Sequence, residues 1–185
     1  YSAKKLKTSG FRSGDTAELH FKDCKTNKTM LLGEPGKGFY YLLKGIQRER
    51  LIGAVALNEL SLHVISETID VLKTKERFGS SLSKKQSIRH KIAELRTKVE
   101  ASKQLTYNSI EAFIRNDSID NEVAMVKIFA YETAKEVIDY CLHLHGAEGF
   151  LENHWLSYTA KDAQAFTLAA GTSEVMRDIL ASLLR

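Results

Sequence analysis

Proline is almost absent from this chain of 185 residues, in which Pro35 is the single example. Proline breaks helices because it lacks a backbone N–H donor, so its scarcity leaves long segments free to form uninterrupted helices. Hydrophobic residues make up 43% of the chain and charged residues 27%, a balance typical of a globular, helix-rich protein. No apolar run reaches the roughly 20 residues that a membrane-spanning helix needs, which argues against a membrane span.

Cysteine is also scarce. Cys24 and Cys141 lie far apart and form no Cys-x-x-Cys motif, which indicates a reducing compartment and no zinc knuckle. A single disulfide between the two cysteines is the alternative. The net charge of +4 is small, and Lys and Arg are spread along the chain. Without a basic stripe, the sequence predicts no nucleic-acid binding and at most a weak preference for anionic ligands.

Familiar catalytic motifs are missing as well. Gly36-Lys37 lacks the earlier glycine and the following hydroxyl residue of a Walker A loop, and no Gly-x-Ser-x-Gly or His-Glu-x-x-His occurs. One cluster invites a metal-site interpretation: His143, His145, Glu148, Glu152 and His154. Di-iron bundles, however, use Glu-x-x-His on inward helix faces, and no Glu here has a His three residues later. The sequence therefore predicts no metal site.

The chain does contain apolar residues at three- and four-residue steps, the pattern of helices with one buried face. The first such helix is expected from Phe39 to Thr74. Its predicted buried face comprises Phe39, Leu43, Ile46, Leu57, Leu60, Val64 and Val71. A second helix is expected from Ile88 to Phe113, on Ile88, Ile92, Leu95, Val99, Ser102, Thr106 and Phe113.

A third helix is expected from Ile119 to Gly146, capped by Asn116-Asp117-Ser118. Its face comprises Ile119, Val123, Val126, Ala130, Ala134, Val137, Cys141 and Leu144. Two shorter helices are expected after it. One runs from Ser157 to Phe166, and the last runs from Ser173 to Leu184 and begins after Gly171-Thr172. Short loops between long helices force neighbours to be antiparallel, so the predicted fold class is all-α, a four-helix up-and-down bundle.

The N-terminal segment differs from the rest. Ala17, Leu19 and Phe21 alternate with polar residues, which predicts one half-buried strand. A single strand is not a sheet, so we expect it to pair with something outside this chain or to dock on the helices. A glycine-rich connector from Leu31 to Gly38 separates it from the first helix. Because Tyr1-Ser2-Ala3 does not resemble a natural start, we expect a fragment of a longer protein.

Glu49 lies on the edge of the apolar face of the first helix, within Gln47-Arg48-Glu49-Arg50-Leu51. Gly53 and Ala56 follow on the same flank and have almost no side chain, which would leave a hollow for a ligand. Glu49 would then be a base and Arg50 an orienting cation. A solvated charge pair is the alternative, and the pattern alone leaves both open.

Three loop clusters lie at helix boundaries: Arg77-Phe78-Gly79 with Gln86, His145 to Phe150, and Ala170 to Glu174. Backbone N–H groups at helix starts can bind phosphate, while helix capping explains any one cluster equally well. Together, in this order and spacing, the clusters resemble the C-terminal part of the acyl-CoA dehydrogenase family. Asp15 to Asp23 is similar to the last strand of that family's middle β domain, and Leu32 to Phe39 to the link that follows it. The resemblance implies domains at residues 1–33, the end of the β domain with its linker, and 34–185, the helical bundle.

In that family a carboxylate removes the α-proton of an acyl-CoA thioester while a hydride passes to FAD, giving a trans-2-enoyl-CoA. The base lies either just before the Gly-Thr of the closing motif, here Ala170, or in a Glu-Arg-Leu of the first bundle helix. Alanine accepts no proton, so the resemblance implies that Glu49 is the base and that Arg50 binds the substrate side, as in the long-chain and isovaleryl-CoA branches. It implies flavin contacts at Lys75, Arg77, Phe78, Gln86, His143, Gly146, Ala147, Gly149, Thr172 and Glu174.

Departures from the family pattern include Lys75, His143 and Ala147, where arginine, glutamine and glycine are usual. The resemblance further implies an electron-transfer flavoprotein as electron acceptor, a homodimer or homotetramer, and the mitochondrial matrix. It also implies that each flavin is shared between subunits, so the isolated chain is expected to be inactive. Two alternatives stay open: a family-derived bundle that serves assembly or partner binding without redox activity, and a CoA-binding module.

Overall fold

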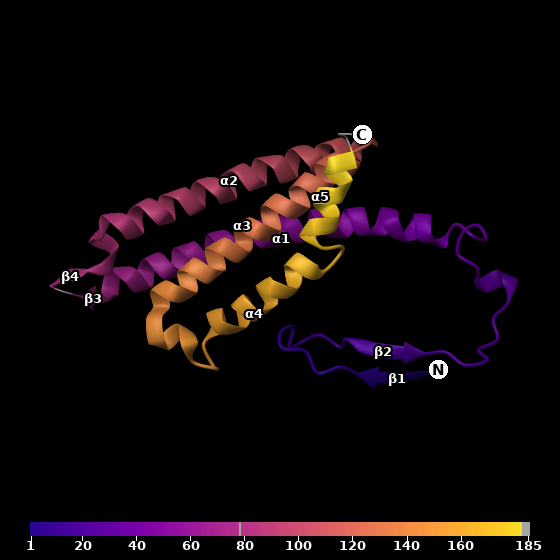
Figure 1. Ribbon diagram of the computed structural model, residues 1–185, viewed down its shortest axis with the longest axis horizontal. Helices are drawn as coiled ribbons and strands as arrows, with labels where there is room; N and C mark the ends of the chain where they lie inside the picture. Colours follow the sequence, from indigo (N-terminus) through magenta and orange to yellow (C-terminus); the bar gives the residue numbers. More distant parts are fainter. Residues whose placement is uncertain (78, 183–185) are drawn as a thin grey trace.

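A computed structural model describes residues 1–77 and 79–182 of the chain. Its helices are α1 (Gly38–Thr74), α2 (Gln86–Ile114), α3 (Asp120–His145), α4 (Trp155–Leu168) and α5 (Ser173–Ala181). Helices α1 to α4 run alternately up and down, and the central α3 packs against α1, α2, α4 and α5 (Figure 1). The predicted all-α bundle is confirmed. The predicted end of the last helix, Leu184, lies outside the described residues.

The apolar faces predicted for the second and third helices form the core. Leu95 and Val99 of α2 are fully buried, as are Val123 and Val137 of α3. Cys141 is buried here and Cys24 is exposed, and both thiols are free. Among the described residues, no helix is both long and apolar enough to cross a membrane.

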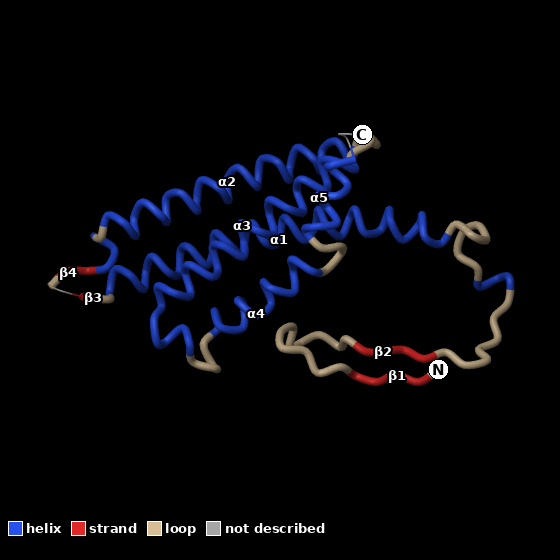
Figure 2. Tube along the Cα trace, viewed as in Figure 1, coloured by secondary structure: helices blue, strands red, loops and turns tan. Residues whose placement is uncertain are grey.

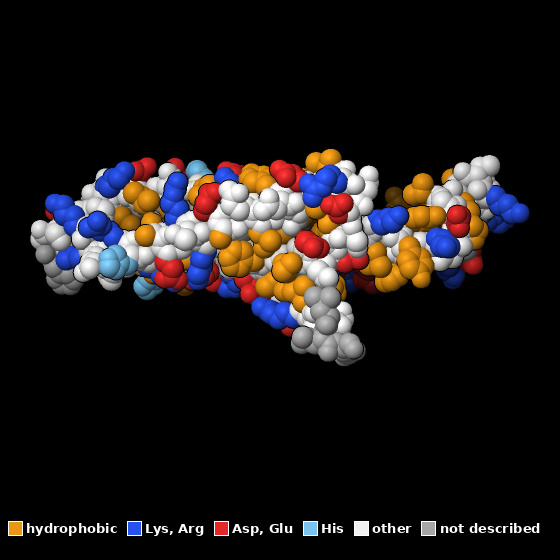
Figure 3. Space-filling view, turned by 90° about the horizontal axis from the view of Figure 1, so that it is seen from above, with side chains coloured by type: hydrophobic (Ala, Val, Ile, Leu, Met, Phe, Trp, Pro, Cys, Tyr) orange, Lys and Arg blue, Asp and Glu red, His pale blue; other side chains and the backbone are white. Residues whose placement is uncertain are grey.

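The buried face predicted for the start of α1 is wrong. Phe39 is 65% exposed and Leu43 40%, whereas burial begins at Leu51. The 37 residues of α1 rise about 56 Å, while the 26 residues of α3 rise about 39 Å, so the first turns of α1 project beyond their neighbours. Hydrophobic side chains gather over this projecting end and the connector before it (Figure 3).

The N-terminal segment is a hairpin, not a single strand with an outside partner. Strand β1 (Ser2–Lys5) pairs antiparallel with β2 (Ala17–His20), with Ala3 opposite Leu19 (Figure 2). Both strands are exposed along their whole length, so the predicted half-burial is also wrong. Strand β1 could not be predicted from the sequence, because Ser-Ala-Lys-Lys does not alternate apolar with polar residues. Short elements complete the chain: β3 (Glu76–Arg77), β4 (Ser80–Ser81) and the 3-10 turns Lys28–Met30, Leu82–Lys84 and Gly146–Phe150.

Two helix starts show how caps form. The cap predicted at 116–118 is wrong: Ile119 precedes α3 and gives no side-chain hydrogen bond, while Asn116 closes the turn with a φ of 62°. The start predicted at Gly171-Thr172 is confirmed. Thr172 Oγ1 accepts a hydrogen bond from the Val175 N–H, 3.4 Å away, at the first turn of α5.

A buried polar cluster joins α1 to α2. Asn58 Nδ2 donates to Thr106 Oγ1 at 3.2 Å, and Ser102 Oγ donates to Asn58 Oδ1 at 2.6 Å.

We expect Asn58→Ala to lower the free energy of unfolding by about 1 to 2 kcal/mol, because two buried hydroxyls lose a partner. Urea unfolding measures the change. Ser66→Ala, on the exposed side of the same helix, is the control, and an equal effect of both variants would show that the cluster contributes nothing.

Candidate functional site

The turn of α1 that carries Glu49 lies against the loop between α4 and α5. Glu49 is exposed, and Arg50 beside it is half-buried. Arg50 Nε donates to the carbonyl oxygen of Ala170 at 2.8 Å. Burial lowers the pKa of the Arg50 guanidinium, while the neighbouring Tyr131 and Glu49 act in the opposite direction. The fold thus brings together two positions that are 120 residues apart in the chain.

The hollow predicted beside Gly53 is filled by Tyr131 of α3. A Cβ at Gly53 would overlap the Tyr131 hydroxyl, which donates to the carbonyl oxygen of Arg50 at 3.2 Å. Burial raises the pKa of Tyr131 to about 12, so the phenol keeps its proton. At Ala56 the flank does open into a groove of about 460 Å³ between α1 and α2. Its lining is almost wholly apolar: Arg48, Leu51, Ile52, Val55, Ala56, Ile110 and Phe113.

The Ala170 to Glu174 segment turns sharply into α5. Ala170 has a φ of 55° and Gly171 a φ of 92°, both in the left-handed region that favours glycine. Glu174 follows in the first turn of α5, where its own backbone amide and the Thr172 hydroxyl lower the pKa of its carboxyl. The hydroxyl of Ser173 is buried without a hydrogen-bond partner among the described residues. This segment therefore offers a helix start with an unused buried hydroxyl.

Lys75 ties the end of α1 to the glycine loop after α3. Its ammonium group donates to the His145 carbonyl oxygen at 2.8 Å and lies 2.6 Å from Glu148 Oε2. His145 is buried, with Nε2 3.2 Å from Thr68 Oγ1. Burial and then the nearby His154 and Lys75 lower the pKa of His145. In the described part of the chain, no three residues that could ligate a metal come together.

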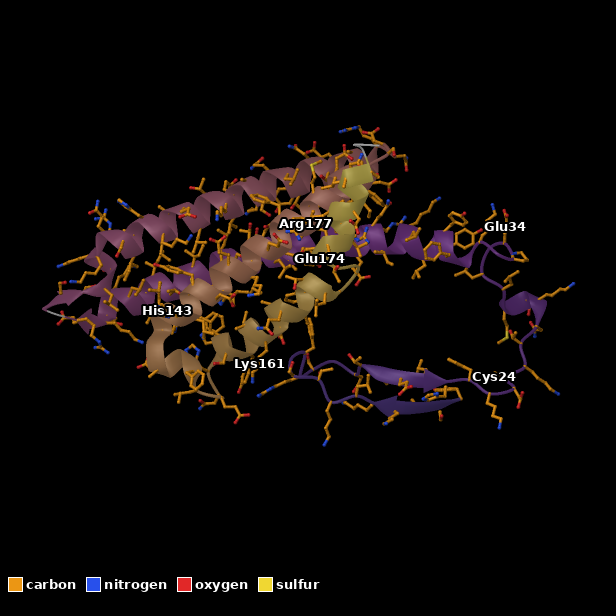
Figure 4. All side chains as sticks on the ribbon, in the orientation of Figure 1. Cys24, Glu34, His143, Lys161, Glu174 and Arg177 are labelled. Carbon is orange, nitrogen blue, oxygen red and sulfur yellow. The ribbon has the colours of Figure 1, made fainter. Side chains whose placement is uncertain are left out.

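A cleft of about 760 Å³ lies between α3 and α4 at this end. His143, Gly146 and Gly149 line it, with Lys161 on the α4 side (Figure 4). Gly146 has a φ of 63° and open space where a side chain would be. Gly149 is packed differently, since a Cβ there would lie 2.9 Å from the Leu142 carbonyl oxygen. Asp139 and Glu152 also line the cleft, so it presents both a lysine and two carboxylates to a ligand.

The other residues predicted to contact flavin are exposed. Arg77 donates to the Glu76 carbonyl oxygen at 2.9 Å, and Gln86 begins α2 with Nε2 3.5 Å from His90 Nε2. Ala147 lies in the 3-10 turn after α3. Phe78 lies outside the described residues. The predicted flavin residues therefore form two groups, one at the β3–β4 end with His143 and one on α5 with Glu174, which lie apart in Figure 4.

Lys127 is a residue that the sequence pattern passed over. It is fully buried, donates to the Phe166 carbonyl oxygen at 2.7 Å and lies 3.8 Å from the ring centre of Tyr131. No described carboxylate forms an ion pair with it. Burial and then the nearby Arg50 lower its pKa to about 8. Its spacing in the sequence does predict burial, because Lys127 lies four residues after Val123 and three before Ala130, on the apolar face of the helix.

Residues 36–184 match a family model described as acyl-CoA dehydrogenase, C-terminal domain. The chain belongs to the acyl-CoA dehydrogenase family. The match includes the Glu49 turn, the glycine loop and the closing segment.

The relatives are full-length enzymes of which this chain covers less than half. It is 30% identical over 178 residues to the mitochondrial long-chain specific acyl-CoA dehydrogenase of Sus scrofa, covering 96% of this chain and 41% of that protein. It is 31% identical over 179 residues to the mitochondrial isovaleryl-CoA dehydrogenase of Pongo abelii, covering 97% and 42%. The crystal structure of an acyl-CoA dehydrogenase from Geobacillus kaustophilus matches with a TM-score of 0.93 and 35% identity, covering 98% of this chain and 48% of that one.

Proposed function

We propose that this chain is the C-terminal part of an FAD-dependent acyl-CoA dehydrogenase that oxidises acyl-CoA thioesters to trans-2-enoyl-CoA, with Glu49 as the base. The hydrogen bond of 2.8 Å from Arg50 to Ala170 carries the proposal, because it joins the Glu49 turn to the closing segment. Glu49 is exposed and forms no ion pair with any described residue, so its carboxylate is available to a substrate. Carboxylates serve as general bases when they are within reach of the proton they remove.

The residues of this chain have separate roles in the proposal. Glu49 takes the α-proton of the thioester. Arg50 binds the substrate side in this proposal and also holds the turn of Glu49 through its bond to Ala170. Bound FAD would accept the β-hydride. Thr172 and Glu174 would hold the flavin at the α5 start, where the buried Ser173 hydroxyl has no described partner. Lys75, Arg77, Gln86, His143, Gly146, Ala147 and Gly149 would hold a second region of FAD, with Phe78 as a further predicted contact.

The residues fit such a ligand at the glycine loop. The open side of Gly146 and the Lys161 ammonium group would suit the pyrophosphate of FAD, because cations bind phosphate oxygens strongly, whereas Asp139 and Glu152 in the same lining would repel it. Lys75 is already engaged by Glu148 and by the His145 carbonyl oxygen, so its role in the proposal is to hold the loop in place.

The isolated chain is expected to bind FAD weakly or not at all. The two predicted flavin groups lie apart on one chain, so each copy supplies only part of the contacts of one site. Gel filtration of the chain after incubation with excess FAD, followed by an absorption spectrum, measures the retained flavin. A yellow protein that keeps one flavin per chain would contradict this expectation, and the full-length protein treated alike is the control.

Partners and location belong to the same proposal. The substrate is an acyl-CoA, the electron acceptor an electron-transfer flavoprotein, and the assembly a homodimer or homotetramer formed through the bundle. The two relatives described above are named as mitochondrial, which supports the mitochondrial matrix, whereas the Geobacillus kaustophilus protein is bacterial. We also propose a domain boundary between residues 33 and 34, before the start of α1 at Gly38.

A second candidate is a bundle without redox activity that serves oligomerisation or partner binding. The ion pair between Lys75 and Glu148 favours it, because a cation expected at the flavin is satisfied within the chain. The flavin content of the full-length protein separates the two. A colourless full-length protein that still self-associates would support this candidate, and binding of a CoA thioester without flavin would indicate a CoA-binding module.

A further inference from the structure

We propose that Lys127 is a positioning residue for the dehydrogenation: its ammonium group fixes the end of α4 and the ring of Tyr131, and through Tyr131 and Arg50 it holds the Glu49 turn against the loop from Ala170 to Thr172. The inference rests on the function proposed above. It concerns a residue that touches neither substrate nor cofactor in that proposal.

The first step is the burial of the Lys127 ammonium group. Its side chain has no exposed surface, and among the described residues its ammonium group donates to the Phe166 carbonyl oxygen at 2.7 Å and lies 3.8 Å from the centre of the Tyr131 ring. Phe166 lies in the last turn of α4, where carbonyl groups lack partners within the helix and a cation is favoured. Lys127 therefore anchors the last turn of α4 to the first third of α3.

The second step runs from Tyr131 to the Glu49 turn. The Tyr131 ring lies under the Lys127 ammonium group, and its hydroxyl donates to the Arg50 carbonyl oxygen in the space left by Gly53. A cation over an aromatic face is attracted to it, and more strongly when both are removed from water. The orientation of the Tyr131 ring thus depends on Lys127. The position of the Arg50 carbonyl group, which accepts the Tyr131 hydrogen bond, depends on it in turn.

The third step concerns the last turn of α4 and the loop between α4 and α5. Lys127 of α3 holds Phe166 in the last turn of α4, and Arg50 of α1 holds Ala170 in the loop that follows. Two cations from two helices thus fix both ends of a segment that leads directly into Thr172 and Glu174. Displacing either cation would move this segment relative to Glu49.

Stability alone does not account for a lysine here. Burial of a charge without a carboxylate costs free energy, and the nearby Arg50 adds repulsion. A methionine of similar length would fill the same space without that cost. The cost is understandable if the lysine sets the geometry of the turn and the loop that meet at Arg50.

The test uses the full-length, flavin-containing protein and the variant Lys127→Met. Reduction of flavin by saturating acyl-CoA, followed by rapid mixing and scaled to bound flavin, should slow about 10- to 100-fold, because misplacement of a base by about 1 Å is enough for such a loss. Acyl-CoA affinity should stay near that of the wild type, and scaling the rate to bound flavin removes any loss of flavin caused by displacement of Thr172 and Glu174. Lys135→Met is the matched control, since Lys135 lies on the same helix and its ion pair in the described part of the chain is with Asp139. Its rate should not change.

Two further measurements separate positioning from a loss of folding. With acyl-CoA deuterated at the α-carbon, the isotope effect on flavin reduction should be larger in Lys127→Met than in the wild type, which a smaller fraction of folded enzyme cannot produce. Tyr131→Phe keeps the ring but removes the hydroxyl that reaches Arg50, so it should slow reduction in the same direction. The double variant should be no slower than the slower single one. Tyr131→Phe also tests the inference if Lys127→Met does not fold.

The outcomes are distinguishable from failure of the proposed function. If Glu49→Gln is slow but Lys127→Met and Tyr131→Phe reduce flavin at the wild-type rate, the positioning role is wrong and the proposed function stands. If Glu49→Gln itself keeps the wild-type rate, the proposed function fails, and the positioning role fails with it. A rate that is low in Lys127→Met with an unchanged isotope effect and normal Tyr131→Phe kinetics also overturns the inference.

Discussion

Glu49→Gln in the full-length protein should slow the reduction of flavin by acyl-CoA by about 10²- to 10⁴-fold, the usual cost of losing a general base. Glutamine keeps the size of the side chain and its hydrogen bonding but does not accept a proton. Rapid mixing with acyl-CoA, monitored through the flavin absorbance, gives the rate. Because Glu49 is exposed and forms no described ion pair, its replacement should leave folding unaffected.

The binding properties of Glu49→Gln are part of the expectation. Acyl-CoA affinity and flavin content should change little, because the role of the carboxylate is chemical. Glu67→Gln is the matched control: Glu67 is an exposed carboxylate on the same helix, and its replacement should leave the rate unchanged. An unaltered reduction rate in Glu49→Gln, with flavin bound, would exclude Glu49 as the base.

The helices were predictable because their cores are built from local periodicity. Ile92, Leu95 and Val99 recur at three- and four-residue steps, and the helix that they define buries that face. The same pattern failed at Phe39 and Leu43, because periodicity reports which face is apolar and not whether a neighbour reaches it. The neighbouring helices end before the projecting turns of α1.

The candidate site could be predicted from the sequence only in part. Glu49 stood out by its place on the edge of an apolar face, which is a local property. The contact from Arg50 to Ala170 and the insertion of Tyr131 at Gly53 depend on how α1, α3 and the closing loop cross, and no spacing within one helix reports such a crossing. Lys127 was hidden for a related reason. A lysine on an apolar face is usually assumed to reach water, and only the position of Phe166 and Tyr131 shows that this one does not.

The contact between Arg50 and Ala170 leads to the second large effect. A glutamate at position 170, introduced as Ala170→Glu in the Glu49→Gln background, should recover about 100-fold of the lost reduction rate, a contribution at the lower end for a general base. Its backbone would adjoin the turn of Glu49, because the Ala170 carbonyl oxygen accepts the Arg50 hydrogen bond. Ala170 already has a φ of 55°, so a glutamate pays no more backbone strain than the alanine it replaces.

Position decides this recovery, and a second variant shows it. Leu168→Glu in the same Glu49→Gln background adds the same charge two residues earlier, at a side chain that is 65% exposed on the last turn of α4. It should restore nothing, because added negative charge alone does not supply a base beside the Glu49 turn. Equal recovery by both variants would mean that charge rather than position is responsible. No recovery by Ala170→Glu, in a protein that still binds flavin and acyl-CoA, would mean that the loop and the Glu49 turn, although joined through Arg50, do not face the same α-carbon.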